Sequence, residues 1–217
     1  HESARAEAKA ADAAVARGDM LGALHGVPVT IKDNVDIAGQ SSPNGLPALK
    51  DMVAEANSPV VDNLLRAGAI VIGRTNAPEF SLRWHTDNPL FGATVNPWNP
   101  EWTPGGSSGG ASASLSAGVG CLAHGNDLGG SVRYPAYCTG LATIRPTQGR
   151  IPAFNPTAKE ERPPLMLLMS TQGPITRSVA DTRLGLEVMA GGDARDPWWV
   201  PAPLEGPKLD RGMKVSL

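Results

Sequence analysis

Two clusters of serine and glycine are the residues of this sequence that could carry out chemistry. The first, PGGSSGG, occupies positions 104–110, and the second, NDLGGS, occupies positions 126–131. Glycine allows sharp turns and a close approach of the backbone to a ligand, so each cluster could hold a reacting serine against a substrate. A serine hydroxyl is a weak nucleophile at its free pKa and needs an adjacent base. A histidine or a lysine can supply that base.

The first cluster matches the nucleophile-elbow pattern G-x-S-x-G, with Ser107 at its centre. Proteins with this elbow place an acidic residue and then a histidine after the serine. The histidine that follows Ser107 is His124, which precedes Asp127 and is too close in sequence for that arrangement. A phosphate-binding loop is a further hypothesis, but the sequence contains neither G-x-x-x-x-G-K-[ST] nor G-x-G-x-x-G, and no lysine directly follows the cluster.

A third hypothesis is that a lysine activates a serine. Lys32 is the candidate base, because it directly follows the apolar run at 27–31. A buried amine is costly unless it is paired or neutral. Burial lowers the pKa of a lysine from ~10.4 by up to several units and turns its amine into a base. A lysine exposed at a strand end is the alternative interpretation. Asp33 and Asn34 follow it and either position the amine or form a turn.

The elements that would position these residues alternate between strand and helix. Apolar and β-branched runs predict strands at 26–31, 69–73, 119–123 and 213–217. Helical patterns, two of them begun by a capping serine at Ser58 and Ser178, predict helices at 3–17, 59–68, 108–118 and 178–190. Continuous apolar strands separated by helices predict an α/β fold whose sheet is covered by helices.

The composition excludes several classes of function. The 217 residues carry 19 Lys and Arg against 21 Asp and Glu, and no stretch concentrates positive charge, so we expect no nucleic-acid partner. No apolar run reaches the ~18 residues of a membrane span, and no signal peptide opens the chain, so we expect no membrane association and a cytoplasmic protein. We expect Cys121 and Cys138 to be core thiols. The histidines lack metal-ligand spacing, so we expect no metal and no organic cofactor.

Three segments together closely resemble the amidase signature family. They are IKDN at 31–34, GGSSGG at 105–110 and DLGGSVR at 127–133. The flanking segments at 26–29, 73–76, 145–147 and 173–178 are also similar to the family, so the resemblance extends from about residue 22 to residue 191. It implies a mixed β-sheet wrapped by helices, in members roughly twice this length. We therefore expect residues 1–217 to form one amidase-signature domain that is truncated at both ends.

The resemblance also implies the role of each site residue. Ser131 is the expected nucleophile, Ser107, after a cis peptide bond, is the bridging serine, and Lys32 is the base. The expected oxyanion hole consists of the backbone N–H groups of Leu128, Gly129, Gly130 and Ser131. Asp127 and Arg133 are expected to brace the loop that carries the nucleophile.

Two positions depart from the family. Asn126 stands where many members have threonine, and Tyr134 stands where the A subunits of aminoacyl-tRNA amidotransferases usually have glutamine. The prediction is an amide hydrolase that takes a small-molecule amide, with a homodimer left open. The glutaminase-bearing A subunit of an amidotransferase and an inactive structural α/β module are the alternatives. Residues 155–169 follow no pattern and are expected to line the substrate pocket.

Overall fold

A mixed five-stranded sheet forms the centre of the computed structural model, which describes residues 2–158, 160–206 and 212. The strands lie in the order β2-β1-β3-β5-β4. β1 (Pro28–Lys32) runs parallel to β2 (Ile70–Thr75) and to β3 (Leu122–Asp127). β5 (Thr171–Thr176) is antiparallel to β3 and to the short β4 (Ala142–Thr143). The mixed α/β sheet expected from the resemblance is confirmed.

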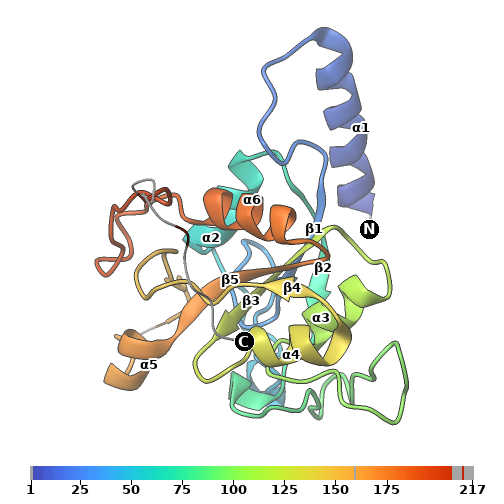
Figure 1. Ribbon diagram of the computed structural model, residues 1–217, viewed down its shortest axis with the longest axis vertical. Helices are drawn as coiled ribbons and strands as arrows, with labels where there is room; N and C mark the ends of the chain where they lie inside the picture. Colours follow the sequence, from blue (N-terminus) through green and yellow to red (C-terminus); the bar gives the residue numbers. More distant parts are fainter. Residues whose placement is uncertain (1, 159, 207–211, 213–217) are drawn as a thin grey trace.

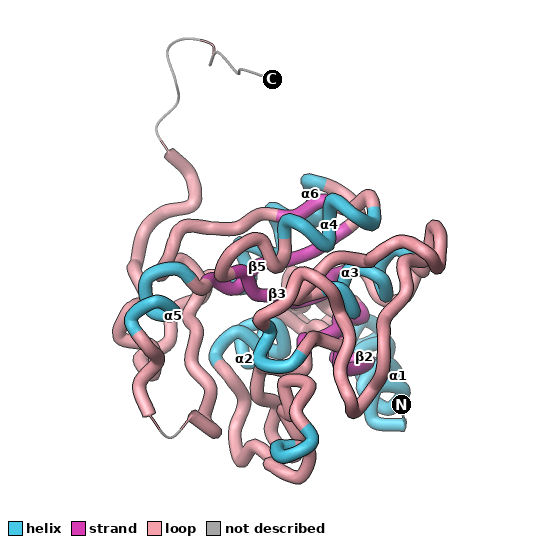
Figure 2. Tube along the Cα trace, turned by 90° about the horizontal axis from the view of Figure 1, so that it is seen from below, coloured by secondary structure: helices cyan, strands magenta, loops and turns pink. Residues whose placement is uncertain are grey.

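Helices cover both faces of this sheet (Figure 1). On one face α2 (Pro59–Arg66) and α6 (Val179–Met189) pack over the sheet, and on the other lie α3 (Gly109–Ser116) and α4 (Arg133–Thr139). The remaining helical segments are α1 (Glu2–Arg17), α5 (Pro164–Met169) and the single 3-10 turns η1 (Pro47–Leu49) and η2 (Glu79–Ser81). Figure 2 shows the loops that join them and α5 set apart from the sheet.

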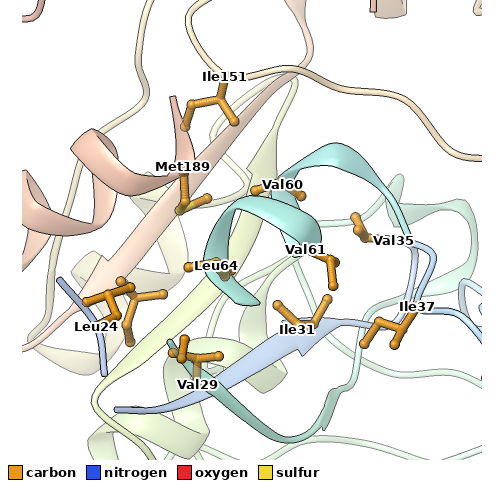
Figure 3. Close-up of a cluster of buried hydrophobic side chains, with 12 residues drawn as sticks. Leu24, Val29, Ile31, Val35, Ile37, Val60, Val61, Leu64, Ile151 and Met189 are labelled. Atoms are coloured by element: carbon orange, nitrogen blue, oxygen red, sulfur yellow. The ribbon is translucent and has the colours of Figure 1, made fainter. Parts of the chain in front are cut away.

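The larger hydrophobic core lies between β1 and α2. Figure 3 shows Val60, Val61 and Leu64 of α2 facing Val29 and Ile31 of β1, and all five side chains are buried. The spacing of the three α2 residues places them on one face of a helix, and alternate residues of β1 point to the same side of the strand. A second buried cluster joins α3 and α4 to the opposite face of the sheet.

Most of the predicted elements are present, with shifts at their ends. The strand expected at 119–123 lies instead at Leu122–Asp127, because Gly118 and Gly120 both adopt positive φ and form the turn before it. That turn leaves Cys121 exposed, and Cys138 is half-buried, so the prediction of two core thiols is wrong. The strand expected at 213–217 falls outside the described residues.

The two predicted capping serines behave differently. Ser178 accepts a hydrogen bond from the Asp181 N–H at 3.1 Å and caps α6 as expected. Ser58 precedes α2 but its hydroxyl caps no helical N–H. It donates instead to Asn155 Oδ1 at 2.6 Å and accepts from the Asp36 N–H. Ser58 therefore ties the start of α2 to the segment after residue 154.

The small residues of α3 allow the helix to lie against the backbone at the end of β2. A Cβ added at Gly110 would lie 2.6 Å from the carbonyl oxygen of Asn76, and the Gly110 N–H donates to that oxygen at 3.2 Å. The carbonyl oxygen of Asn76 belongs to the backbone, which cannot rotate away as a side chain can. Gly110 is therefore required by the contact.

Gly110→Ala is expected to lower the free energy of unfolding by ~1–3 kcal/mol, the usual cost of overpacking. Gly73→Ala is the matched control, because a Cβ there meets nothing within 4 Å and the backbone of Gly73 is extended. This control should change stability by less than ~1 kcal/mol. Urea titration of the whole natural polypeptide that contains these residues measures both. Equal losses in the two variants would contradict the contact argument.

Candidate active site

The sheet brings the ends of three strands to one edge. β1 and β3 are parallel, so Lys32 and Asp127, their last residues, lie at the same edge of the sheet. β5 runs the other way, so its first residues, Thr171 and Gln172, reach that edge beside Asp127 and Asn126. The carboxyl ends of parallel strands are a common place for ligand sites in α/β sheets. The polar second half of β3 is thus placed where chemistry can occur.

The Lys32 side chain is fully buried at this edge, in agreement with the reading of a buried amine. Its Nζ donates to Ser107 Oγ at 2.7 Å and to Asn126 Oδ1 at 2.8 Å. Burial lowers the pKa of Lys32 from 10.5 to about 7, although the carboxylates of Asp33 and Asp127 act in the opposite direction. At neutral pH a large fraction of the amine is therefore uncharged.

Asn126 is held in place by a second amide. Asn126 Nδ2 donates to Asn34 Oδ1 at 2.9 Å, and Asn34 Nδ2 donates back to Asn126 Oδ1 at 3.2 Å. Asn34 also donates to Ser81 Oγ at 3.0 Å. The pair fixes the oxygen that binds Lys32. The sequence indicates Asn34 only as a neighbour of the lysine and Asn126 only as a departure from the family.

Ser107 lies in the loop that enters α3, and its peptide bond with Gly106 is cis. Thr86 holds this loop: its buried hydroxyl donates to the Gly105 carbonyl at 2.9 Å and accepts from the Gly109 N–H at 3.1 Å. Sequence reasoning missed Thr86, because it sits in a long loop without periodicity. Its two hydrogen bonds keep Ser107 beside the Lys32 amine.

Asp127 organises the loop that carries Ser131. Its carboxylate accepts from the Gly130 N–H at 2.7 Å, from the Val132 N–H at 3.1 Å and from Arg133 Nε at 3.0 Å. Burial alone would raise the pKa of Asp127, but these hydrogen bonds outweigh it and hold the pKa below its usual value. The bracing contacts implied by the resemblance are therefore present. Because the Gly130 N–H donates to Asp127, it is not free to bind another acceptor.

Ser107 and Ser131 line the same cavity, which has a volume of about 810 Å³. Ser131 is buried, and its carbonyl accepts from the Ser108 N–H at 3.2 Å, which links the two glycine-serine clusters. Within the described residues, no hydrogen bond joins the Ser107 and Ser131 hydroxyls. In the same part of the chain, the N–H groups of Leu128, Gly129 and Ser131 have no protein partner.

Apolar side chains form much of the cavity wall, namely those of Phe80, Leu82, Leu128, Phe154, Met166, Leu167 and Trp198. The segment at 155–169 contributes Asn155, Ala158 and the face of α5 that carries Met166. Residues of this segment therefore line the cavity, and that the cavity holds the substrate stays a prediction. Charged side chains also line the cavity, namely those of Glu160, Glu161, Arg162, Arg195 and Asp196. A cavity of this size suits a small molecule whose apolar part packs against the apolar side chains.

Comparisons with known proteins agree with this geometry. The family model described as Amidase matches residues 1–216. Indoleacetamide hydrolase of Bradyrhizobium diazoefficiens is 62% identical over 97% of this chain and 40% of its own length. The A subunit of the glutamyl-tRNA(Gln) amidotransferase of Synechococcus sp. WH7803 is 40% identical over 94% of the chain and 40% of its own length.

Among solved structures, a bacterial aryl acylamidase of the amidase signature family superimposes with a TM-score of 0.84 at 36% identity. The match covers 94% of this chain and 41% of that one. The chain thus spans about 40% of the length of the relatives it matches. A match over nearly every residue, together with the lysine and the two glycine-serine clusters at one sheet edge, shows that the chain belongs to the amidase signature family.

Proposed function

We propose that this protein hydrolyses carboxylic amides to acid and ammonia or amine, with Ser131 as nucleophile, Ser107 as bridging serine and Lys32 as base. The observation that carries the proposal is the buried Lys32 amine, whose pKa is lowered to about 7, at 2.7 Å from a serine that faces the cavity. Such an amine is costly to bury and adds nothing to packing that an apolar side chain would not supply. An inactive structural module is therefore the weaker alternative.

The neutral amine can act as the base because it has one lone pair. It donates to Asn126, accepts the proton of Ser107, and Ser107 in turn accepts the proton of Ser131. Ser131 Oγ then attacks the amide carbonyl carbon, and the C–N bond breaks when the relay returns a proton to the leaving nitrogen. Water, deprotonated by the same relay, hydrolyses the resulting ester and regenerates Ser131.

The negative oxygen formed during attack needs hydrogen-bond donors. The backbone N–H groups of Leu128, Gly129 and Ser131 are free to supply them among the described residues, whereas that of Gly130 is bound to Asp127. We therefore assign the oxyanion hole to the first three. Such donors are typically worth ~10²–10³ in rate each.

The substrate class follows from the cavity. The apolar part of its wall favours amides with a large apolar acyl group, and the relative with 62% identity is named for the hydrolysis of indoleacetamide. We propose arylacetamides as substrates. The amidotransferase alternative is less well supported, because that relative shares 40% identity and Tyr134 replaces the glutamine usual in those proteins.

The predicted homodimer and cytoplasmic location stay predictions. None of the helices in the described parts of the chain has the length and hydropathy that a membrane span requires.

Ser131→Ala is expected to abolish covalent labelling by a fluorophosphonate, because it removes the attacking oxygen. Ser107→Ala should keep the nucleophile but break the relay, and should slow labelling by ~10²–10⁴-fold. Ser108→Ala, in the same block, is the matched control and should label like the parent. Rates of labelling of the whole natural polypeptide, read by intact mass, decide the outcome. Rapid labelling of Ser107→Ala would refute the relay.

The pH dependence tests Lys32. Its pKa is lowered, so the active neutral form accumulates as pH rises through about 7, and kcat/KM should rise there and then level off. Lys32→Ala should remove this rise of kcat/KM with pH, the alkaline limb of the profile. Lys32→Arg should not restore the rate, because a guanidinium stays protonated. His85→Gln is the control, because His85 is exposed and should leave the limb unchanged. A fully active Lys32→Arg enzyme would show that the site uses the positive charge.

Asn126→Asp tests the oxygen that binds the amine. It places a carboxylate of nearly the same shape at 2.8 Å from Lys32 Nζ, which favours the protonated amine. The alkaline limb should move upward by ~1–3 pH units. Asn126→Thr, the residue many members carry, adds no charge and should leave the midpoint near that of the parent. An unchanged midpoint in Asn126→Asp would mean that this oxygen does not control Lys32.

A further inference from the structure

The carboxamide of Gln172 lies in the cavity but takes no part in the steps above. Gln172 is the second residue of β5 and lies opposite Asn126 in the antiparallel pairing with β3. Opposite residues in such a pair project from the same face of the sheet. Gln172 therefore stands beside the amide that binds Lys32, on the wall that also contains Ser131.

His124 holds one end of this carboxamide. It precedes Asn126 by two residues on β3, so both side chains project from the same face. The imidazole is fully buried, and its Nε2 lies 2.7 Å from Gln172 Oε1. A carbonyl oxygen only accepts, so His124 Nε2–H is the donor.

The protonation state of His124 supports this arrangement. Burial lowers the pKa of His124 to about 4, so the ring is neutral at working pH and carries a single N–H. His124 Nδ1 is buried without a partner among the described residues, and an unpaired acceptor is tolerated better than an unpaired N–H. The single hydrogen therefore belongs on Nε2. Nδ1 carries the lone pair and is buried, and His124 is not among the described residues that line the cavity of Ser131, so the ring is not placed to act as a base for the reaction.

The consequence lies at the other end of Gln172. With Oε1 occupied by His124, the amide plane is fixed and the NH₂ group is turned away from the imidazole. Gln172 Nε2 donates to none of the described residues. Gln172 lines the cavity and keeps 8% of its surface exposed, so we place its two N–H donors toward the cavity.

We propose that Gln172 binds a hydrogen-bond acceptor on the acyl group of the substrate, away from the scissile amide, and that His124 is its positioning residue. This inference rests on the proposed amide hydrolysis and narrows its substrate class. The preferred acyl groups carry a pyridine-type ring nitrogen, an ether oxygen or a carbonyl oxygen on their apolar body, because an indole N–H donates and cannot accept. An acyl group without such an atom would cover the NH₂ and leave it unpaired, which costs binding energy.

Matched pairs of substrates test this. Phenylacetamide and the 2-, 3- and 4-pyridylacetamides differ only in one ring CH or nitrogen. The whole natural polypeptide should hydrolyse at least one pyridylacetamide with a kcat/KM ~3- to 10-fold above that for phenylacetamide, the value of one hydrogen bond. Gln172→Met, which keeps the size but removes the donors, should lose this preference while retaining hydrolysis of phenylacetamide. Gln172→Glu, which replaces donors by acceptors, should lose it as well.

His124→Leu should weaken the preference without abolishing hydrolysis of phenylacetamide, because the freed carboxamide can rotate. Thr171→Val is the control: Thr171 is the buried neighbour of Gln172, its hydroxyl has no partner among the described residues, and its side chain points to the other face of β5. It should keep the substrate ratio of the parent.

Two results would overturn the inference. One is the absence of any preference for a pyridylacetamide in the parent protein, and the other is a preference that survives Gln172→Met. Both leave the proposed function intact if phenylacetamide is hydrolysed and a fluorophosphonate labels Ser131. Failure of labelling and of all four hydrolyses would instead refute the proposed function, and the role of Gln172 with it.

Discussion

The burial of one amine is the constraint on which the rest of this structure depends. Lys32 Nζ has no contact with bulk water and two oxygen partners, Ser107 Oγ and Asn126 Oδ1. Desolvation pushes its pKa down, and the neighbouring carboxylates push it up, so the balance falls near neutrality. Without burial, the pKa of Lys32 would return toward its ordinary value and the amine would be an ammonium at neutral pH. Without the carboxylates, its pKa would be lower and the amine would stay neutral over a wider pH range. A pKa near neutrality requires both effects at once.

The mixed sheet supplies these partners from distant parts of the chain. Lys32 is separated from Ser107 by 75 positions and from Asn126 by 94. Parallel pairing of β1 with β3 puts their carboxyl ends together, and antiparallel pairing adds the amino end of β5. An all-parallel sheet would bring the other end of β5 to this edge. The change of direction between β3 and β5 is therefore what places Gln172 in the cavity.

Sequence pattern predicts the strands and helices whose formation depends on neighbouring residues, such as an apolar run or a capping side chain. The apolar runs of β1 and β2 and the capping serine of α6 indicate their elements well. The same reasoning places β3 too early, because its second half, from His124 to Asp127, is polar and resembles a loop. Local pattern singles out Lys32 and the two glycine-serine clusters, and the motif resemblance supplies the role expected of Lys32, Ser107 and Ser131. Thr86 and Gln172 cannot be found this way, because their partners are set by pairing between segments far apart in sequence.

Asp127 connects the shape of the loop that carries Ser131 to the pKa of Lys32. Its hydrogen bonds with Arg133 and with two backbone N–H groups keep its pKa low, so it is charged throughout the range in which Lys32 titrates. Its influence on the amine is therefore constant.

Asp33 differs, because burial raises its pKa to about 6, close to that of Lys32. As pH rises, Asp33 becomes charged first and then favours the proton on the adjacent amine. Interacting groups with such similar pKa values lose their protons in two steps whose apparent pKa values belong to the pair, so the expected rise of kcat/KM with pH reports Lys32 together with Asp33.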